Sequence, residues 1–153
     1  MTSVSRTIAA TPTEVFGQLA DGWIYAAWVV GASHIRGVDP GWPAVGTRIH
    51  HRVGPWPMAI DDTTEVVEAV TGSRLVLQAR AWPAGEARVD IRIEPDDVGS
   101  MVTMSEAPTR GIGTWLDNPL QRLVLRRRNI ESLARLATLA EKRPNPRTGA
   151  VTD

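Results

Sequence analysis

The hydrophobic pattern of this sequence changes its period once, and that change constrains the fold more than any other feature. Apolar and polar residues alternate strictly over Ala87–Glu94, the period of a half-buried strand. Beyond Pro108–Gly113, apolar residues return at helical spacing from Leu116 to Ala137, and the pattern reaches Lys142 before Pro144 ends it. The sequence therefore predicts a sheet followed by a C-terminal helix about 40 Å long.

Turn signals between Gly31 and Gly99 recur roughly every ten residues, which is typical of an antiparallel meander. The inward parity of Ala87–Glu94 is repeated before it by Leu75, Leu77 and Ala79, and after it by Val102 and Met104. The parity of Ile60–Val70 stays undecided, because both of its faces mix apolar and charged residues.

The N-terminal segment predicts one strand and two short helices. Val4–Ala9 alternates loosely, and Thr11, Pro12 and Glu14 form the capping box and first turn of a helix. A break at Asp21-Gly22 precedes a second short helix over Trp23–Val29. With the sheet and the long helix, this order indicates an α+β fold.

Length and composition limit the classes of function. The 153 residues fit one domain, expected over 1–143, with a flexible tail at 144–153. Seventeen basic residues balance seventeen acidic ones, which disfavours nucleic-acid binding, and no cysteine is present. No apolar run of about 18 residues predicts a membrane span. We expect a cytoplasmic protein without integral membrane association, and a homodimer stays open.

Several short segments, together with this element order, resemble the START-like superfamily, also called Bet v 1-like or SRPBCC, in its polyketide cyclase/dehydrase-like branch. The resemblance extends roughly over residues 3–143 and rests on Ile8–Phe16, Trp28, Gly46–Arg48, Ser73–Leu77, Gly99–Met104 and Asn129–Leu136. It implies a helix-grip fold, in which a curved seven-stranded antiparallel sheet surrounds the long C-terminal helix and leaves an apolar cavity. Fold alone does not give the function, because the superfamily includes lipid carriers, aromatase/cyclases and hormone receptors.

Two charged residues are expected inside that cavity. Arg127 falls on the apolar stripe of the predicted helix, and a buried guanidinium needs a partner. Glu106 continues the inward parity of Val102 and Met104. We therefore expect an Arg127–Glu106 pair in the cavity. In the alternative reading, Arg127 extends to water and Glu106 lies at the rim.

The histidines do not predict a metal site. His50 and His51 are adjacent in a strand, so they point to opposite faces and cannot share one ion from there. His51 has the parity of Ile49, so we expect it in the cavity wall, either as a hydrogen-bonded core residue or as an acid or base. No motif predicts a cofactor.

The expected ligand-binding residues combine aromatic side chains at element ends with the inward faces of strands and helix. Flat apolar ligands would suit the tryptophans, although tryptophan is also ordinary core filler. Besides His51, Glu106 and Arg127, which are also weak catalytic candidates, the set is Trp28, Trp56, Leu77, Ala79, Val89, Ile91, Met104, Trp115, Leu120, Leu123 and Val124.

Three functions fit these features. The leading hypothesis is a protein that binds or carries a hydrophobic small molecule such as a lipid or a polyketide-like compound. The first alternative is a polyketide cyclase or dehydratase that acts on a ligand in the same cavity, with His51, Glu106 or Arg127 assisting proton transfer. The second alternative is a module that binds another protein.

Overall fold

The computed structural model describes residues 2–53, 60–81, 85–111 and 118–142. In chain order the elements are β1 (Thr2–Ile8), α1 (Pro12–Leu19), the short 3-10 turn η1 (Gly22–Ile24), α2 (Tyr25–Trp28), β2 (Ala32–Val38), β3 (Arg48–Val53), β4 (Ile60–Val70), β5 (Arg74–Ala81), β6 (Gly85–Pro95), β7 (Ser100–Arg110) and α3 (Pro119–Glu141).

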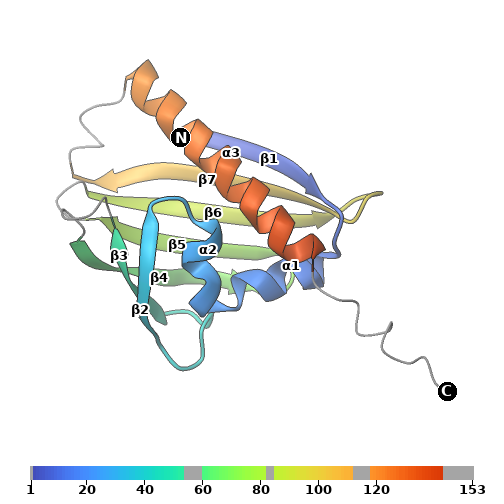
Figure 1. The fold of residues 1–153 in the computed structure, drawn as a ribbon, viewed down its shortest axis with the longest axis horizontal. Helices are drawn as coiled ribbons and strands as arrows, with labels where there is room; N and C mark the ends of the chain where they lie inside the picture. The colour runs from blue at the N-terminus through green and yellow to red at the C-terminus, as the bar shows by residue number, and fades with distance from the viewer. Residues whose placement is uncertain (1, 54–59, 82–84, 112–117, 143–153) are drawn as a thin grey trace.

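The strands form one antiparallel seven-stranded sheet in the order β1-β7-β6-β5-β4-β3-β2. The chain leaves β1 at one edge, passes through the short helices and enters β2 at the other edge, so every later strand pairs with the strand before it. The three α-helices lie on one face of the sheet, and α3 runs diagonally across it (Figure 1). The predicted α+β helix-grip fold is confirmed.

The two faces of the sheet differ in polarity, as the alternating pattern predicts. Leu75, Ile91 and Val102 on three adjacent strands are almost fully buried against the helices. On the opposite face, Arg74 donates to Glu68 at 3.0 Å and to Asp90 at 2.8 Å. A sheet with one dry and one wet face must cover its dry face with helices to keep water away.

A bulge in β4 explains why the parity of this strand could not be read from the sequence. Thr64 and Val66 point inward and are fully buried, but the register with β5 shifts between Val66 and Glu68. Val67 is exposed there, and Ala69 then packs against the core. Because a bulge adds one residue to one strand, the inward set changes from even to odd residue numbers.

The start of α1 is fixed by the predicted capping box and by the turn between β6 and β7. Thr11 Oγ1 accepts from the Glu14 amide at 3.2 Å, and Glu14 accepts from the Thr11 amide at 3.1 Å. Ser100 Oγ donates to the carbonyl oxygen of Ala10 at 2.6 Å. Gly99 has a φ of +158°, and a Cβ there would lie 2.6 Å from the Ala10 oxygen, so this turn requires glycine.

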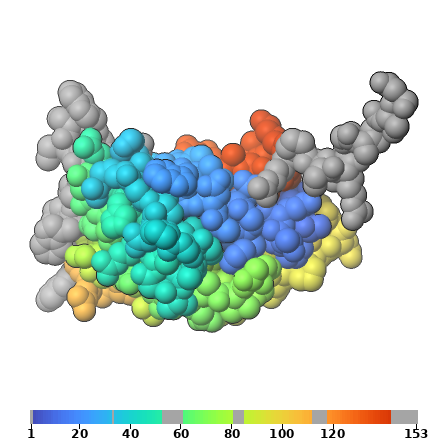
Figure 2. Space-filling model, turned by 90° about the horizontal axis from the view of Figure 1, so that it is seen from below, coloured from blue at the N-terminus to red at the C-terminus, as the bar shows by residue number. Residues whose placement is uncertain are grey.

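The β2–β3 end of the sheet packs beside the first helices. Figure 2 shows this region, from cyan to teal, next to the blue surface of α1 and α2. Trp42, between β2 and β3, donates its indole N–H to the carbonyl oxygen of Leu19 at the end of α1. The far edge of the sheet is thus attached to the helical layer.

The predicted apolar stripe of α3 is wrong in its first half. The buried side of the helix consists of Asn129, Ser132, Leu133, Leu136, Ala137 and Ala140. Leu120, Leu123 and Val124 were expected inside but are 70%, 45% and 59% exposed. The reason is geometric: Val124 and Leu133 are nine residues apart, which is about two and a half turns of helix, so they point to opposite sides and cannot both face the sheet.

Some expectations lie outside the described residues: the start of the long helix at Leu116, the tryptophans Trp56 and Trp115, and the tail at 144–153. Among the helices that are described, none combines the length and the apolar character needed to cross a membrane.

Candidate functional site

A cavity of about 220 Å³ lies between the helices and the inner face of the sheet. Its walls come from α2 and the segment that follows it, from strands β3 to β7, and from the first two thirds of α3. Ser132 Oγ on α3 accepts from the Val30 amide at 3.1 Å. This bond fixes the segment after α2 to α3 and so holds one side of the cavity.

Part of the sheet wall of the cavity, at Leu77, Ala79, Ala87, Val89 and Met104, is apolar. Leu77 pairs with Val89 across β5 and β6, and Ala79 pairs with Ala87 in the next inward position. Two alanines directly opposite each other leave room that larger side chains would fill. Together with Met104 on β7, these residues form an apolar floor of the cavity.

One polar group in the wall is a hydrogen-bonded row of three side chains. His51 Nε2 lies 2.8 Å from Thr64 Oγ1, and Thr64 Oγ1 lies 3.3 Å from the Tyr25 hydroxyl. The rings of Tyr25 and His51 are stacked with centroids 5.8 Å apart. Burial lowers the pKa of His51 and raises the pKa of Tyr25, so at neutral pH both rings are uncharged.

A second polar group is built around Glu106, which is 5% exposed. The Arg128 guanidinium forms an ion pair with its carboxylate, and Asn129 Nδ2 donates to Oε2 at 2.9 Å. Both donors come from adjacent positions on α3, whereas Glu106 lies on β7. The buried carboxylate is thereby compensated by a cation and a neutral donor.

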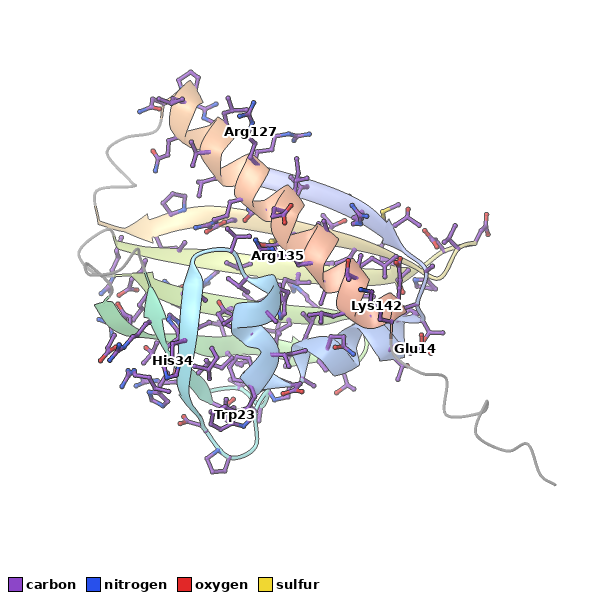
Figure 3. The ribbon with its side chains drawn as sticks, viewed as in Figure 1. Glu14, Trp23, His34, Arg127, Arg135 and Lys142 are labelled. Carbon is purple, nitrogen blue, oxygen red and sulfur yellow. The ribbon has the colours of Figure 1, made fainter. Side chains whose placement is uncertain are left out.

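The prediction that Arg127 points inward and pairs with Glu106 is wrong, because Arg128 makes that pair. Arg127 is exposed and lies on the same helix face as Leu123, Val124 and Ile130, which are exposed too. Figure 3 labels it on the first half of α3, well away from Lys142 at the other end. Its neighbour Arg128, one residue further along the helix, reaches the cavity.

Two polar atoms in the cavity wall have no partner. Among the described residues, the buried side-chain nitrogens and oxygens without a hydrogen bond are Nδ1 of His51 and Oε1 of Gln121. Both residues line the cavity. Because an unsatisfied buried polar atom is destabilising, two of them on residues that line one cavity indicate that polar groups of a ligand or water complete them.

The structure brings half of the expected wall residues together. Those that line the cavity are Trp28, His51, Leu77, Ala79, Val89, Met104 and Glu106. Ile91 is fully buried in the core but does not line the cavity, and Leu120, Leu123, Val124 and Arg127 are exposed. Their role in ligand binding stays a prediction.

Sequence reasoning missed the polar residues Tyr25, Thr64, Arg128 and Asn129. Asn129 and Ser132 interrupt the apolar pattern of α3, and no periodicity of apolar residues could place them on the buried face. Thr64 lies just before the β4 bulge, in the strand whose parity could not be decided. A signal for Tyr25 was available, since it is the sole tyrosine of the chain and lies in the predicted second helix.

His50 and His51 occupy opposite faces of β3, as predicted. His50 Nε2 donates to Asp39 at 2.9 Å on the outer side, and this bond lowers the pKa of the Asp39 carboxyl. Within residues 2–53, 60–81, 85–111 and 118–142, no three histidine or acidic side chains gather closely enough to hold a metal ion.

Comparison with known proteins gives one family and many similar folds. Residues 1–141 match the family model described as polyketide cyclase / dehydrase and lipid transport. The comparison with curated proteins finds no match.

Three of the similar solved structures illustrate the fold. The protein CV1439 from Chromobacterium violaceum has a TM-score of 0.68 at 19% identity, covering 92% of this chain and 97% of that one. Ara h 8.0201 has a TM-score of 0.70 at 12% identity, covering 92% and 97%. The di-domain ARO/CYC StfQ from the steffimycin biosynthetic pathway has a TM-score of 0.70 at 11% identity, covering 97% of this chain and 51% of that one. At these identities the likeness shows the fold alone.

Proposed function

Because the chain belongs to the polyketide cyclase/dehydrase and lipid transport family, we propose that it binds a small hydrophobic molecule in the cavity between α3 and the sheet. The observation that carries this proposal is the cavity itself, an apolar space whose wall also contains the two unpartnered polar atoms. Mostly apolar walls with a few polar groups are typical of small-molecule sites.

The composition of the wall supports a ligand role over plain packing. An empty apolar space of this size costs a fold several kcal/mol, because the lining atoms lose contacts that a filled core would give them. Ala79 and Ala87, opposite each other, keep the space open where two larger residues would close it. A bound apolar molecule would restore those contacts.

Native mass spectrometry of freshly purified protein tests the proposal. The expected result is a retained molecule, or saturable binding of a hydrophobic probe such as 1-anilinonaphthalene. Ala79→Leu should fill the cavity and weaken the binding of either. Ala107→Leu is the matched control, because Ala107 pairs with Arg88 and follows the outward parity of β7. Equal binding by wild type and Ala79→Leu would place the ligand elsewhere and contradict the proposal.

A second candidate function is an enzyme of the cyclase or dehydratase type. The row Tyr25, Thr64 and His51 favours it, because it connects a neutral imidazole to a phenol in the wall of the cavity. Such a row can take up or supply a proton beside a bound carbonyl compound. Conversion of a synthetic polyketide chain, followed by mass spectrometry, should then stop in His51→Phe. Tight binding without conversion would contradict the enzyme function and support binding only.

A further inference from the structure

The buried imidazole of His51 has one nitrogen with a partner and one without. Nε2 lies 2.8 Å from Thr64 Oγ1, whereas Nδ1 has no partner among the described residues although the side chain is only 2% exposed. Which of the two nitrogens carries the proton decides whether the cavity offers a hydrogen-bond donor or an acceptor at this point. The neighbouring hydroxyl groups settle that choice.

Tyr25 begins the row as a donor. Burial raises the pKa of its hydroxyl, so the phenol keeps its proton and needs an acceptor. In the described part of the chain, the partner within reach is Thr64 Oγ1 at 3.3 Å. A phenol that donates to Thr64 leaves the hydroxyl hydrogen of Thr64 free to point toward His51.

The direction of the bond from Tyr25 to Thr64 determines the direction of the bond between Thr64 and His51. The single hydroxyl hydrogen of Thr64 is donated to Nε2, which must therefore carry the lone pair, and the proton of the neutral ring is on Nδ1. The opposite direction would leave the Tyr25 O–H without an acceptor and Nδ1 without a donor. The first arrangement leaves one unsatisfied group and the second leaves two, so the first is favoured.

We infer that the ligand of this cavity carries a carbonyl oxygen, which accepts a hydrogen bond from Nδ1–H of His51 while the rest of the molecule lies against the apolar wall. This inference rests on the proposed binding function and adds the chemical class of the ligand. A ketone or ester on an apolar ring or chain satisfies the one remaining donor of the row. A hydroxyl oxygen can also accept from Nδ1–H, but its own hydrogen then needs a further acceptor, which a carbonyl does not require. A pure hydrocarbon leaves Nδ1–H buried without a partner.

Three bicyclic probes of nearly the same shape test the inference: tetralin, 1-tetralone and 1-tetralol. Calorimetric titration of the wild-type protein should give binding of all three, with 1-tetralone about tenfold tighter than tetralin, as a neutral hydrogen bond to an otherwise unsatisfied group predicts. His51→Phe keeps the flat ring and removes Nδ1–H. In this variant the ratio of the affinity for 1-tetralone to the affinity for tetralin should fall from about ten to about one.

A second variant and a spectrum keep the test decisive if His51→Phe does not fold. Tyr25→Phe removes the hydroxyl that sets the direction of the row, so the ratio of the affinity for 1-tetralone to the affinity for tetralin should decrease several-fold. The ¹⁵N chemical shifts of the His51 imidazole in the free wild-type protein should report the Nδ1–H tautomer.

The outcomes separate the two proposals. Equal affinity for tetralin and 1-tetralone, tighter binding of 1-tetralol than of 1-tetralone, or an Nε2–H tautomer would each overturn the carbonyl inference and leave the binding function standing. Failure of every probe to bind the cavity would overturn both. A ketone preference that persists unchanged in both variants would place the carbonyl contact at another residue and overturn the role of His51.

Discussion

The buried side chain of Glu106 is held by two donors on α3. Arg128 neutralises the carboxylate, and Asn129 occupies a further lone pair at 2.9 Å. The pair is asymmetric in exposure, since the Arg128 side chain is 37% exposed and that of Glu106 only 6%. Arg128 can therefore be solvated after a substitution elsewhere, whereas Glu106 depends on its protein partners.

This asymmetry predicts different effects for neighbouring arginines. Arg128→Gln should lower the free energy of unfolding by about 1–2 kcal/mol, a range kept small because Arg128 is partly solvated. Arg127→Gln is the matched control and should change it by less than about 0.5 kcal/mol, since Arg127 is exposed. Urea denaturation measures both. Equal effects of the two substitutions would contradict the assignment of Arg128 to Glu106.

A double substitution tests whether the two residues act as a pair. Glu106→Gln combined with Arg128→Gln removes both charges, so it should be less destabilising than the sum of the single substitutions. Additive effects would show that Arg128 stabilises the protein through other contacts.

His51 predicts a pH dependence of stability. Burial lowers its pKa in the folded protein below the usual histidine value of 6.5, so between the two pKa values the unfolded chain binds more protons. The free energy of unfolding should therefore rise with pH in that window and fall when the pH is lowered from about 7.5 to about 5.5. Thermal unfolding at a series of pH values measures it.

Two substitutions isolate the contribution of His51. His51→Phe should lose this part of the pH dependence, and His34→Gln, at an exposed position on β2, should keep it. Asp39 and Asp90 have lowered pKa values because His50 and Arg74 donate to them, so their contribution to stability is lost only below about the usual aspartate value of 3.8. The same slope in wild type and His51→Phe would rule out His51 as its source.

At this scale the sequence predicted those site residues that follow strand alternation. Glu106 and His51 share the parity of apolar neighbours, and the structure places both in the cavity wall. On the helix the prediction missed by one position, because it assigned to Arg127 the ion pair that Arg128 makes. A helix turns by about 100° per residue, so an error of one position changes the face that a side chain occupies.

At the scale of elements, α3 has two functions along its length. Its second half packs Leu133, Leu136 and Ala140 into the core, and its first half contributes Gln121, Leu125 and Arg128 to the cavity. The apolar pattern predicted the helix but not this division, because the exposed Leu120, Leu123 and Val124 are as apolar as the buried set. The tertiary packing, which the sequence pattern does not contain, selects the buried face.

Leucine substitutions on α3 test this assignment of faces. Leu136→Ala should destabilise the protein by about 2–5 kcal/mol, because it removes a fully buried side chain from the core. Leu123→Ala removes the same atoms from a side chain that is 45% exposed, and should cost less than about 0.5 kcal/mol. Chemical denaturation of the two variants distinguishes the faces. A larger loss of unfolding free energy in Leu123→Ala than in Leu136→Ala would contradict this assignment of faces and support the stripe predicted from the sequence.

At the scale of the whole molecule, the fold separates stability from the site. The core beneath the second half of α3 is densely packed with α1 and the inner faces of β1, β6 and β7. The cavity lies beneath the first half, where the sheet contributes the small side chains of Ala79 and Ala87 among larger ones, and the helix contributes Gln121, Leu125 and Arg128. A ligand can therefore enter one region while the other maintains the structure.

This separation predicts that a ligand stabilises the protein only through the cavity. At a concentration of about one hundred times its Kd, 1-tetralone should raise the free energy of unfolding by about 2.7 kcal/mol, which for a domain of this size raises Tm by about 5–10 °C. Ala79→Leu fills the cavity with apolar atoms, so its own stability should change by less than about 1.5 kcal/mol while most of the ligand-induced increase disappears. Ala107→Leu, on the outer face, should retain the increase. Scanning calorimetry with and without the ligand measures these shifts, and an undiminished increase in Ala79→Leu would mean that the stabilising site lies outside the space between α3 and the sheet.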